Sequence, residues 1–363
     1  MFGSFRFVLA VMVVLSHVGG VEIIASIAVW GFFMLSGFLM TAVLNKKYGF
    51  SSQGLKRFAA SRALRLMPTY WVLLICSAVA VYMLKPLGDP RLINEAFGFP
   101  ENMRDVFANL FLIGQTTFGV GRIENSLSPS AWAVEVEVLM YACSAILLSR
   151  SIRVAQIALV VLAVAFCATW YFAKHLAAVG ELSYASQLVY SFLPAALVPY
   201  TIGVNLWFLR AKYEKLKFSW VGLFFGASGM LIGVFIIGRI TATGSYLWGL
   251  PFVALIIILL SKLNRRDHSW SVVDELLGRM SYPIYLGQWL CAYLIFALAS
   301  PDDTLFFIEN KRVVFNWLGF WAVLMTLLAL SLVIAIFIEG PVERARHAFV
   351  AGKSVSSGKR NER

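Results

Sequence analysis

Arg6 and His17 are the residues of this chain whose types and spacing point most clearly to chemistry. They bracket an otherwise apolar run and lie eleven positions apart, close to three whole helical turns, so both side chains face the same side. The rise between them is about 16 Å, which sets an arginine at the rim of a membrane helix and a histidine at depth. Ionisable groups at depth are costly and usually line a functional interior, where a histidine can act as a base or nucleophile. A topogenic arginine with a packed histidine is the alternative interpretation.

Two carboxylates open a second apolar segment, which runs from Trp132 to Tyr141. Glu135 and Glu137 are two positions apart and point to nearly opposite helix faces, so only one can readily face the interior of a helix bundle. Glu137 and Tyr141 share a face at a spacing of four, and an intramembrane carboxylate is by default functional. Trp132 suits the membrane interface. The alternative leaves Glu135 in the headgroup layer with no specific role.

The depths of His17 and Glu137 make a shared site geometrically possible. Counted along their helices, both fall in the outer half of a hydrocarbon core about 30 Å thick. The sequence by itself does not establish that the two helices touch. We therefore treat a common outward-facing cavity as a hypothesis.

Arg62 and Arg65 form a pair at the cytoplasmic mouth of a third apolar segment. At a spacing of three they lie on one helix face. The planar guanidinium fork suits phosphate recognition, so the pair is a candidate site for an anionic substrate. Simple topogenic charge is the alternative.

Other polar positions in apolar segments have mainly structural interpretations. The stretch 31–37 contains Ser36 among small residues that allow close helix contact, and packing alone is the preferred interpretation there. Tyr282 lies near the start of a later helix. Pro341 is expected to end the last helix on the inside, where Glu339 is expected to pair with a neighbouring arginine.

Composition places these residues in a membrane protein. The chain has 363 residues, of which 60% are hydrophobic and 14% charged, values that do not fit a soluble domain. Its net charge of +12 comes from basic residues clustered between apolar runs, which is a topology signal and not a nucleic-acid footprint. The four cysteines lie inside apolar runs and lack metal-ligand spacing, so no metal site is expected. The fold class predicted is all-α and polytopic.

Windowed hydropathy predicts about ten transmembrane helices. Basic residues concentrate in alternate loops, so the positive-inside rule places both termini in the cytoplasm. The loop at 85–130 then lies outside, where long loops often act as lids or binding loops. Residues 1–345 are expected to form the membrane domain and 346–363 a basic, disordered cytoplasmic tail. The predicted spans are 6–23, 24–45, 66–85, 131–149, 153–173, 186–209, 219–238, 245–262, 281–299 and 314–338.

Taken together and in order, these segments resemble the acyltransferase family 3 membrane proteins, which O-acylate cell-surface glycans and other extracytoplasmic acceptors. Each motif is weak alone, but the ordered set spans almost the whole chain and is fairly specific. The matching motifs are Arg6-x10-His17, Phe-Phe-x-Leu-Ser36-Gly37, Arg62-x-x-Arg65, Trp132 to Tyr141, Ser281-Tyr282-Pro-x-Tyr-Leu286 and Glu339-x-Pro341.

The resemblance implies an acyl-CoA donor, usually acetyl-CoA, that arrives from the cytoplasm as co-substrate, with no bound cofactor. It implies a glycan or lipid-linked sugar acceptor on the outer side of a bacterial inner membrane. It implies that His17 and Glu137 are catalytic and that three arginines bind the donor. A further set of residues is implied to bind the acceptor or to support the site. The donor-side arginines are Arg6, Arg62 and Arg65, and the supporting set is Trp132, Tyr141, Ser36, Tyr282 and Gln288.

The chain departs from the family pattern at two places. Ala133-Val134 stands where Ser-Leu is common, and Gln288 stands where many members carry a histidine. Glutamine can hydrogen-bond but cannot act as a base near neutral pH, so a second-histidine role is in doubt. The soluble hydrolase-like domain fused to some relatives is not expected, so such an acyl-handling partner would be a separate protein.

Two other function classes stay open at this point. A multi-pass exporter of a glycan, lipid or anionic solute would use His17 and Glu137 as a proton or substrate site, although no fixed-period internal repeat supports it. A scaffold or sensor would make no use of the buried ionisable residues. The acceptor, the acyl group, the choice between direct and acyl-histidine transfer, and the oligomeric state are likewise open.

Overall fold

The computed structural model describes residues 1–213, 215, 245–263, 271–299 and 304–346, and there the regular structure is almost entirely helical. One antiparallel hairpin interrupts the helices, with β1 (Phe306–Glu309) paired to β2 (Arg312–Phe315). The long helices are α1 (Phe2–His17), α2 (Glu22–Val43), α3 (Ser52–Leu84), α5 (Ala131–Cys143), α6 (Ile152–Ala178), α8 (Leu193–Tyr213), α10 (Ser245–Leu263), α11 (Ser271–Leu298) and α12 (Trp317–Ile334). The shorter ones are α4 (Met103–Phe111), α7 (Leu182–Tyr190) and a 3-10 turn at Pro90–Leu92, and π-turns extend three long helices at Leu44–Tyr48, Ser144–Leu148 and Ala335–Glu339.

The helices confirm a polytopic all-α membrane protein. Seven described helical segments are long and apolar enough to cross a membrane, and they fall on seven of the expected spans. Two shorter apolar helices, Phe2–His17 and Leu247–Lys262, fall on the first and eighth spans. The seventh span, 219–238, and the tail 347–363 lie outside the described residues. The total of ten spans and the side of each terminus stay predictions.

The first helix is shorter than expected. The prediction ran from 6 to 23, but α1 ends at His17 because Gly20 takes a left-handed conformation with φ of 75°. His17 is therefore the last residue of its helix. Arg6 lies one turn inside the other end.

Two further boundaries differ from the prediction. α3 starts at Ser52 and not near 66, with the Ser51 hydroxyl accepting from the Gly54 amide as an N-cap, so Arg62 and Arg65 lie within the helix. Pro341 does not end the last helix, since helical structure continues to residue 346. The preceding π-turn, Ala335–Glu339, widens the helix just before the proline, an adjustment of the kind that accommodates proline within a helix.

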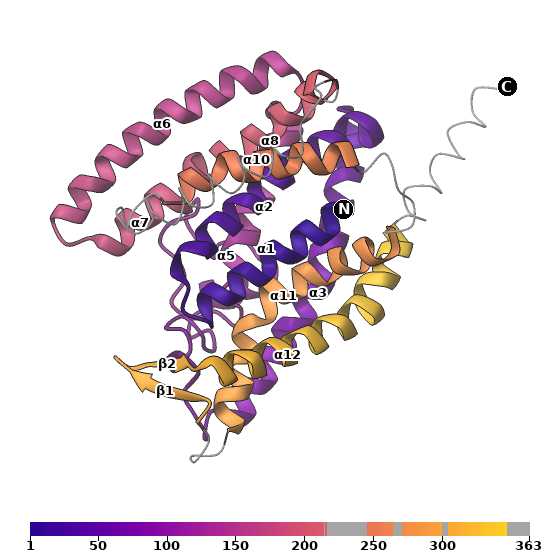
Figure 1. Cartoon of the computed structure of the whole chain (residues 1–363). Helices are drawn as coiled ribbons and strands as arrows, with labels where there is room; N and C mark the ends of the chain where they lie inside the picture. The colour runs from indigo at the N-terminus through magenta and orange to yellow at the C-terminus, as the bar shows by residue number, and fades with distance from the viewer. Residues whose placement is uncertain (214, 216–244, 264–270, 300–303, 347–363) are drawn as a thin grey trace, which may run out of the picture.

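The core forms around α2, which packs against α1, α8 and α10 (Figure 1). Close approach to α8 depends on glycine, because a Cβ on Gly37 would lie 2.0 Å from the Tyr200 carbonyl oxygen. The contact is reciprocal, since a Cβ on Gly203 of α8 would lie 1.9 Å from the Met34 carbonyl oxygen. Close helix contact at the end of the stretch 31–37 is thus confirmed at Gly37. Peripheral α6 runs along one edge of the molecule, and only 11% of its apolar window is buried.

The elements that bear on the site gather at two ends of the molecule. The start of α1 and the end of α12 lie at one end, and the β-hairpin lies at the opposite end (Figure 1). The loop between α3 and α5 is folded onto the helices, because the Tyr70 hydroxyl donates to the Asn109 carbonyl at 2.6 Å and the Trp71 indole donates to the Leu110 carbonyl at 2.8 Å. The loop that was expected to lie outside thus packs against the helices and contains a helix of its own, α4.

Candidate active site

An open cavity with an empty volume of about 620 Å³ lies between α1, α2, α3, α5 and α11. Six of the predicted site residues line it: Arg6, Ser36, Arg65, Glu137, Tyr141 and Tyr282. The rest of its wall is mostly apolar, and Tyr285 joins it from α11. Six residues from five different helices therefore meet in one cavity. The sequence motifs had linked these residues to one reaction but had not shown that they lie together.

Glu137 is the carboxylate that faces this cavity. Its Oε1 accepts from the Tyr141 hydroxyl at 2.6 Å, which confirms the shared helix face, and from the Ser36 hydroxyl of α2. Both donors act on the same oxygen, so no described hydrogen bond occupies Oε2. Ser36 therefore has a polar role in addition to the packing role of its segment.

The three predicted donor-side arginines do not share one environment. Arg6 and Arg65 line the cavity and act on each other electrostatically. Arg62 does not line it, and its guanidinium lies over the Phe58 ring at 5.8 Å. Arg62 still acts electrostatically on Arg65 and Tyr141, so it lies near the cavity without lining it.

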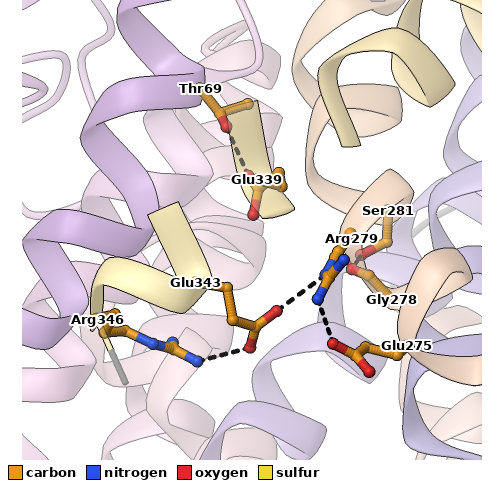
Figure 2. Close-up of polar contacts among 8 residues, drawn as sticks. All are labelled: Thr69, Glu275, Gly278, Arg279, Ser281, Glu339, Glu343 and Arg346. Carbon is orange, nitrogen blue, oxygen red and sulfur yellow. Dashed lines mark hydrogen bonds and ion pairs between the residues drawn. The ribbon is translucent and has the colours of Figure 1, made fainter. Parts of the chain in front are cut away.

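Arg65 also lines a second, smaller cavity of about 200 Å³ with Glu339, Glu343 and Arg346. Glu343 bridges two arginines there: its Oε2 accepts from Arg279 at 3.0 Å and its Oε1 accepts from Arg346 at 2.8 Å (Figure 2). Arg65 is thus the side chain common to the two cavities. Glu343 and Arg346 were not singled out in the sequence, although their place just after the Glu339-x-Pro341 motif was a usable signal.

Glu339 does not form the expected ion pair. Its buried carboxylate accepts from the Thr69 hydroxyl of α3 at 2.5 Å (Figure 2). The arginine contacts go to Glu343 instead, one turn further along the helix. In the described residues Glu339 is thus held by Thr69 and acts on Arg65 only electrostatically, while Glu343 forms the ion pairs.

His17 lies next to this cavity without lining it. Its Nδ1 is 3.1 Å from Oε1 of Gln288, and its ring stacks on Trp289 with centroids 5.0 Å apart. Gln288 donates in turn to the backbone carbonyl of Tyr285, which does line the cavity. The hypothesis of a common cavity is met only by Glu137, since His17 is not among the lining residues and its described hydrogen bond goes to Gln288.

The loop between α3 and α5 is held to the helices by Glu135, whose role the sequence left open. Its buried carboxylate accepts from the amides of Gly114 and Thr116, at 2.5 and 2.9 Å, and from the Thr116 hydroxyl at 2.9 Å. Glu135 therefore ties the loop between α3 and α5 to α5, while Glu137 lines the cavity. The alternative of a headgroup carboxylate with no role is wrong.

Trp132 is buried, and the Arg122 guanidinium of the same loop lies over its ring at 4.3 Å. Burial lowers the pKa of Arg122 from its usual range, with the Tyr190 and Tyr285 hydroxyls opposing that shift. Arg122 also acts electrostatically on His17, so the loop brings a basic side chain near that histidine. No motif flagged Arg122, because a single arginine in a polar loop carries no sequence signal.

The described residues hold no group of three or more His, Cys, Asp or Glu side chains placed to bind a metal ion. What they offer is a histidine with one nitrogen engaged, a carboxylate with one free oxygen, and two arginines facing it. Such a set can bind an anionic substrate and move a proton, which are the requirements of group transfer to a hydroxyl.

Comparison with known proteins gives one match. The family model described as acyltransferase domain, acyltransferase family 3, matches residues 4–339. No curated protein and no solved structure matches the chain.

Proposed function

The chain belongs to acyltransferase family 3 and is an acyltransferase, and from this premise we propose a membrane-bound O-acyltransferase that moves an acyl group, in the simplest case acetyl, from cytoplasmic acyl-CoA to a hydroxyl of an extracytoplasmic glycan. The observation that carries the proposal is the position of Arg65. It is common to the cavity that holds Glu137 and to the smaller cavity near the end of α12. A donor with a charged head and a long apolar arm suits two spaces that share a basic side chain.

The donor side of the proposal rests on charge. Arg65, with Arg6 above it, offers guanidinium groups to the phosphates of a CoA ester, and Arg346 flanks the smaller cavity. The apolar walls of the larger cavity, such as Phe32 and Val134, suit the acyl-pantetheine arm. We place this end of the molecule on the cytoplasmic side, as the positive-inside rule predicts.

The chemical step balances with the residues present. A nitrogen of neutral His17 takes the proton of the acceptor hydroxyl while the acceptor oxygen attacks the thioester carbonyl carbon. The carbon–sulfur bond then breaks, the CoA thiolate leaves, and the imidazolium returns the proton to it. The products are an O-acyl ester and free CoA. Transfer through an acyl-histidine uses the same nitrogen as nucleophile.

Glu137 supports the step from the cavity side in this scheme. Ser36 and Tyr141 hold one oxygen, and the other is free to accept from a hydroxyl or to hold an arginine in place. On the outer side, the loop tied down by Glu135 carries Arg122 toward the acceptor. The partners of the proposed enzyme are then acyl-CoA, a glycan or lipid-linked sugar, and the membrane lipids of a bacterial inner membrane.

The test is release of CoA together with the mass of the glycan. Purified protein in liposomes is given acetyl-CoA, and the free thiol is followed with and without acceptor sugar. Surface glycans from cells with the gene intact, deleted, or restored as His17→Ala are compared by mass spectrometry. The proposal predicts an acetyl increment only with the intact gene. Full acylation with His17→Ala would overturn the mechanism, and unchanged glycans with no CoA release in all strains would favour an exporter.

A further inference from the structure

Gln288 on α11 has a side chain that is fully buried, and described hydrogen bonds engage both its amide oxygen and its amide nitrogen. Its Nε2 donates to the Tyr285 carbonyl at 2.9 Å and to the Ser130 hydroxyl at 3.0 Å. Its Oε1 lies 3.1 Å from Nδ1 of His17. A buried amide held at three points has one orientation, because flipping it would set oxygen against oxygen.

The fixed point in this network is the Tyr285 carbonyl. A backbone carbonyl can only accept, so the group facing it must be the amide nitrogen of Gln288. The amide oxygen therefore faces His17, and that oxygen also can only accept. Nδ1 of His17 must then carry the hydrogen, since the alternative places two acceptors in contact.

The other ring nitrogen of His17 is left with its lone pair. In neutral imidazole one nitrogen is a donor and the other an acceptor, and the hydrogen bond made by one decides the state of the other. The stacked Trp289 ring, inclined by only 22°, limits rotation of the imidazole plane. No described hydrogen bond engages Nε2 of His17, while Nδ1 meets the buried amide.

We propose that Gln288 is a positioning residue that holds neutral His17 as the Nδ1–H tautomer and so makes Nε2 the reacting atom. The proposal rests on the proposed function for the role of His17, but the tautomer itself does not depend on activity. Because an amide cannot take a proton, the hydroxyl proton accepted at Nε2 stays on the imidazolium until the CoA thiolate receives it. The amide oxygen of Gln288 accepts from Nδ1–H throughout.

The tautomer can be read directly by nitrogen-15 NMR of histidine-labelled full-length protein in liposomes. The chain has 4 histidines, so the spectrum of His17→Asn identifies the His17 signals by difference. At alkaline pH we expect a protonated Nδ1 and an unprotonated Nε2 for His17. A signal pair with Nε2 protonated in the unmodified protein would overturn the proposal, and this measurement needs no variant of Gln288.

Kinetics separates positioning from mere stability. Gln288→Met removes the acceptor at similar volume, and we expect kcat to fall about 100-fold with the KM for acetyl-CoA unchanged, the loss typical of a misaligned reacting group. Gln288→Glu keeps an acceptor and adds a charge that favours imidazolium, so the acid limb of the pH–rate profile should move to higher pH. Gln53→Met, at an exposed position at the start of α3, is the matched control.

The outcomes distinguish this proposal from the proposed function. If the NMR shows the Nδ1–H tautomer but no acyl transfer occurs, the function is wrong and the tautomer assignment holds. If transfer occurs and Gln288→Met keeps its kcat, or the acid limb of Gln288→Glu does not move, Gln288 is not a positioning residue. A folded Gln288→Glu protein, checked by its melting temperature, covers the case in which Gln288→Met does not fold.

Discussion

Ser36 and Glu137, 101 positions apart in the chain, share a hydrogen bond between α2 and α5, with the hydroxyl donating to Oε1 of the carboxylate. Tyr141 donates to the same oxygen at 2.6 Å. The carboxylate is thus fixed from two helices, and Glu137 lines the same cavity as Arg6 and Arg65. A carboxylate that is fixed in position and faces two arginines is preorganised for a charged substrate.

Removing the charge of Glu137 should lower acyl transfer strongly. We expect Glu137→Gln to reduce kcat about 100-fold or more, the scale of losing one preorganised electrostatic contact. Ser36→Ala should cost less, since Tyr141 still holds the oxygen. Ser331→Ala is the control, because the buried Ser331 hydroxyl has no hydrogen-bond partner in the described structure. Equal kcat values for Glu137→Gln and the unmodified enzyme, measured at saturating acetyl-CoA, would remove Glu137 from the site.

Arg65 should matter more for the donor than Arg62. Arg65 lines both cavities, while Arg62 lies over Phe58 and lines neither. We expect Arg65→Ala to raise the KM for acetyl-CoA about tenfold or more, as for loss of one charge-assisted hydrogen bond. Arg62→Ala is the matched variant and should change this KM far less. The reverse order would show that the donor phosphates bind outside the two cavities.

Glu135 should hold the outer loop and leave chemistry at the cavity intact. Glu135→Ala leaves the Gly114 and Thr116 amides and the Thr116 hydroxyl without their carboxylate acceptor. We expect this to lower the free energy of unfolding by about 1–3 kcal/mol. The expected result is a lower melting temperature and faster proteolysis between residues 112 and 121. CoA release at saturating acceptor should persist in this variant. A loop as resistant to protease as that of the unmodified protein would show that other contacts hold it.

Gly37→Ala should disturb the contact between α2 and α8. The new Cβ would meet a backbone oxygen at 2.0 Å, so a helix must shift, at a cost of about 1–3 kcal/mol. Gly340→Ala is the control, since its Cβ would lie in ordinary contact at 3.5 Å from its neighbours. Melting temperatures in the same detergent compare the two variants. Similar temperatures for both would mean that α2 and α8 can separate slightly without loss.

Much of the fold follows from local rules that a sequence displays. Apolar runs of spanning length give the helices, and the period of 3.6 residues sets Glu137 and Tyr141 on one face, as their hydrogen bond confirms. The predicted helix boundaries were wrong where a single backbone feature decides where a helix ends. The left-handed Gly20 ends α1, and the π-turn before Pro341 lets the last helix continue.

Contacts between helices required the tertiary structure. His17 contacts Gln288, 271 positions away, and Arg65 lines the cavity whereas Arg62 does not, although both lie on one helix. The physical reason is that the sequence fixes which residues share a helix face, while the rotation and spacing of helices depend on packing, such as Gly37 against the Tyr200 carbonyl. The sequence by itself therefore determined a helical membrane protein and the chemical types in its motifs. Only the tertiary structure decided that Glu137 faces arginines, that Glu135 holds a loop, and that an amide holds His17.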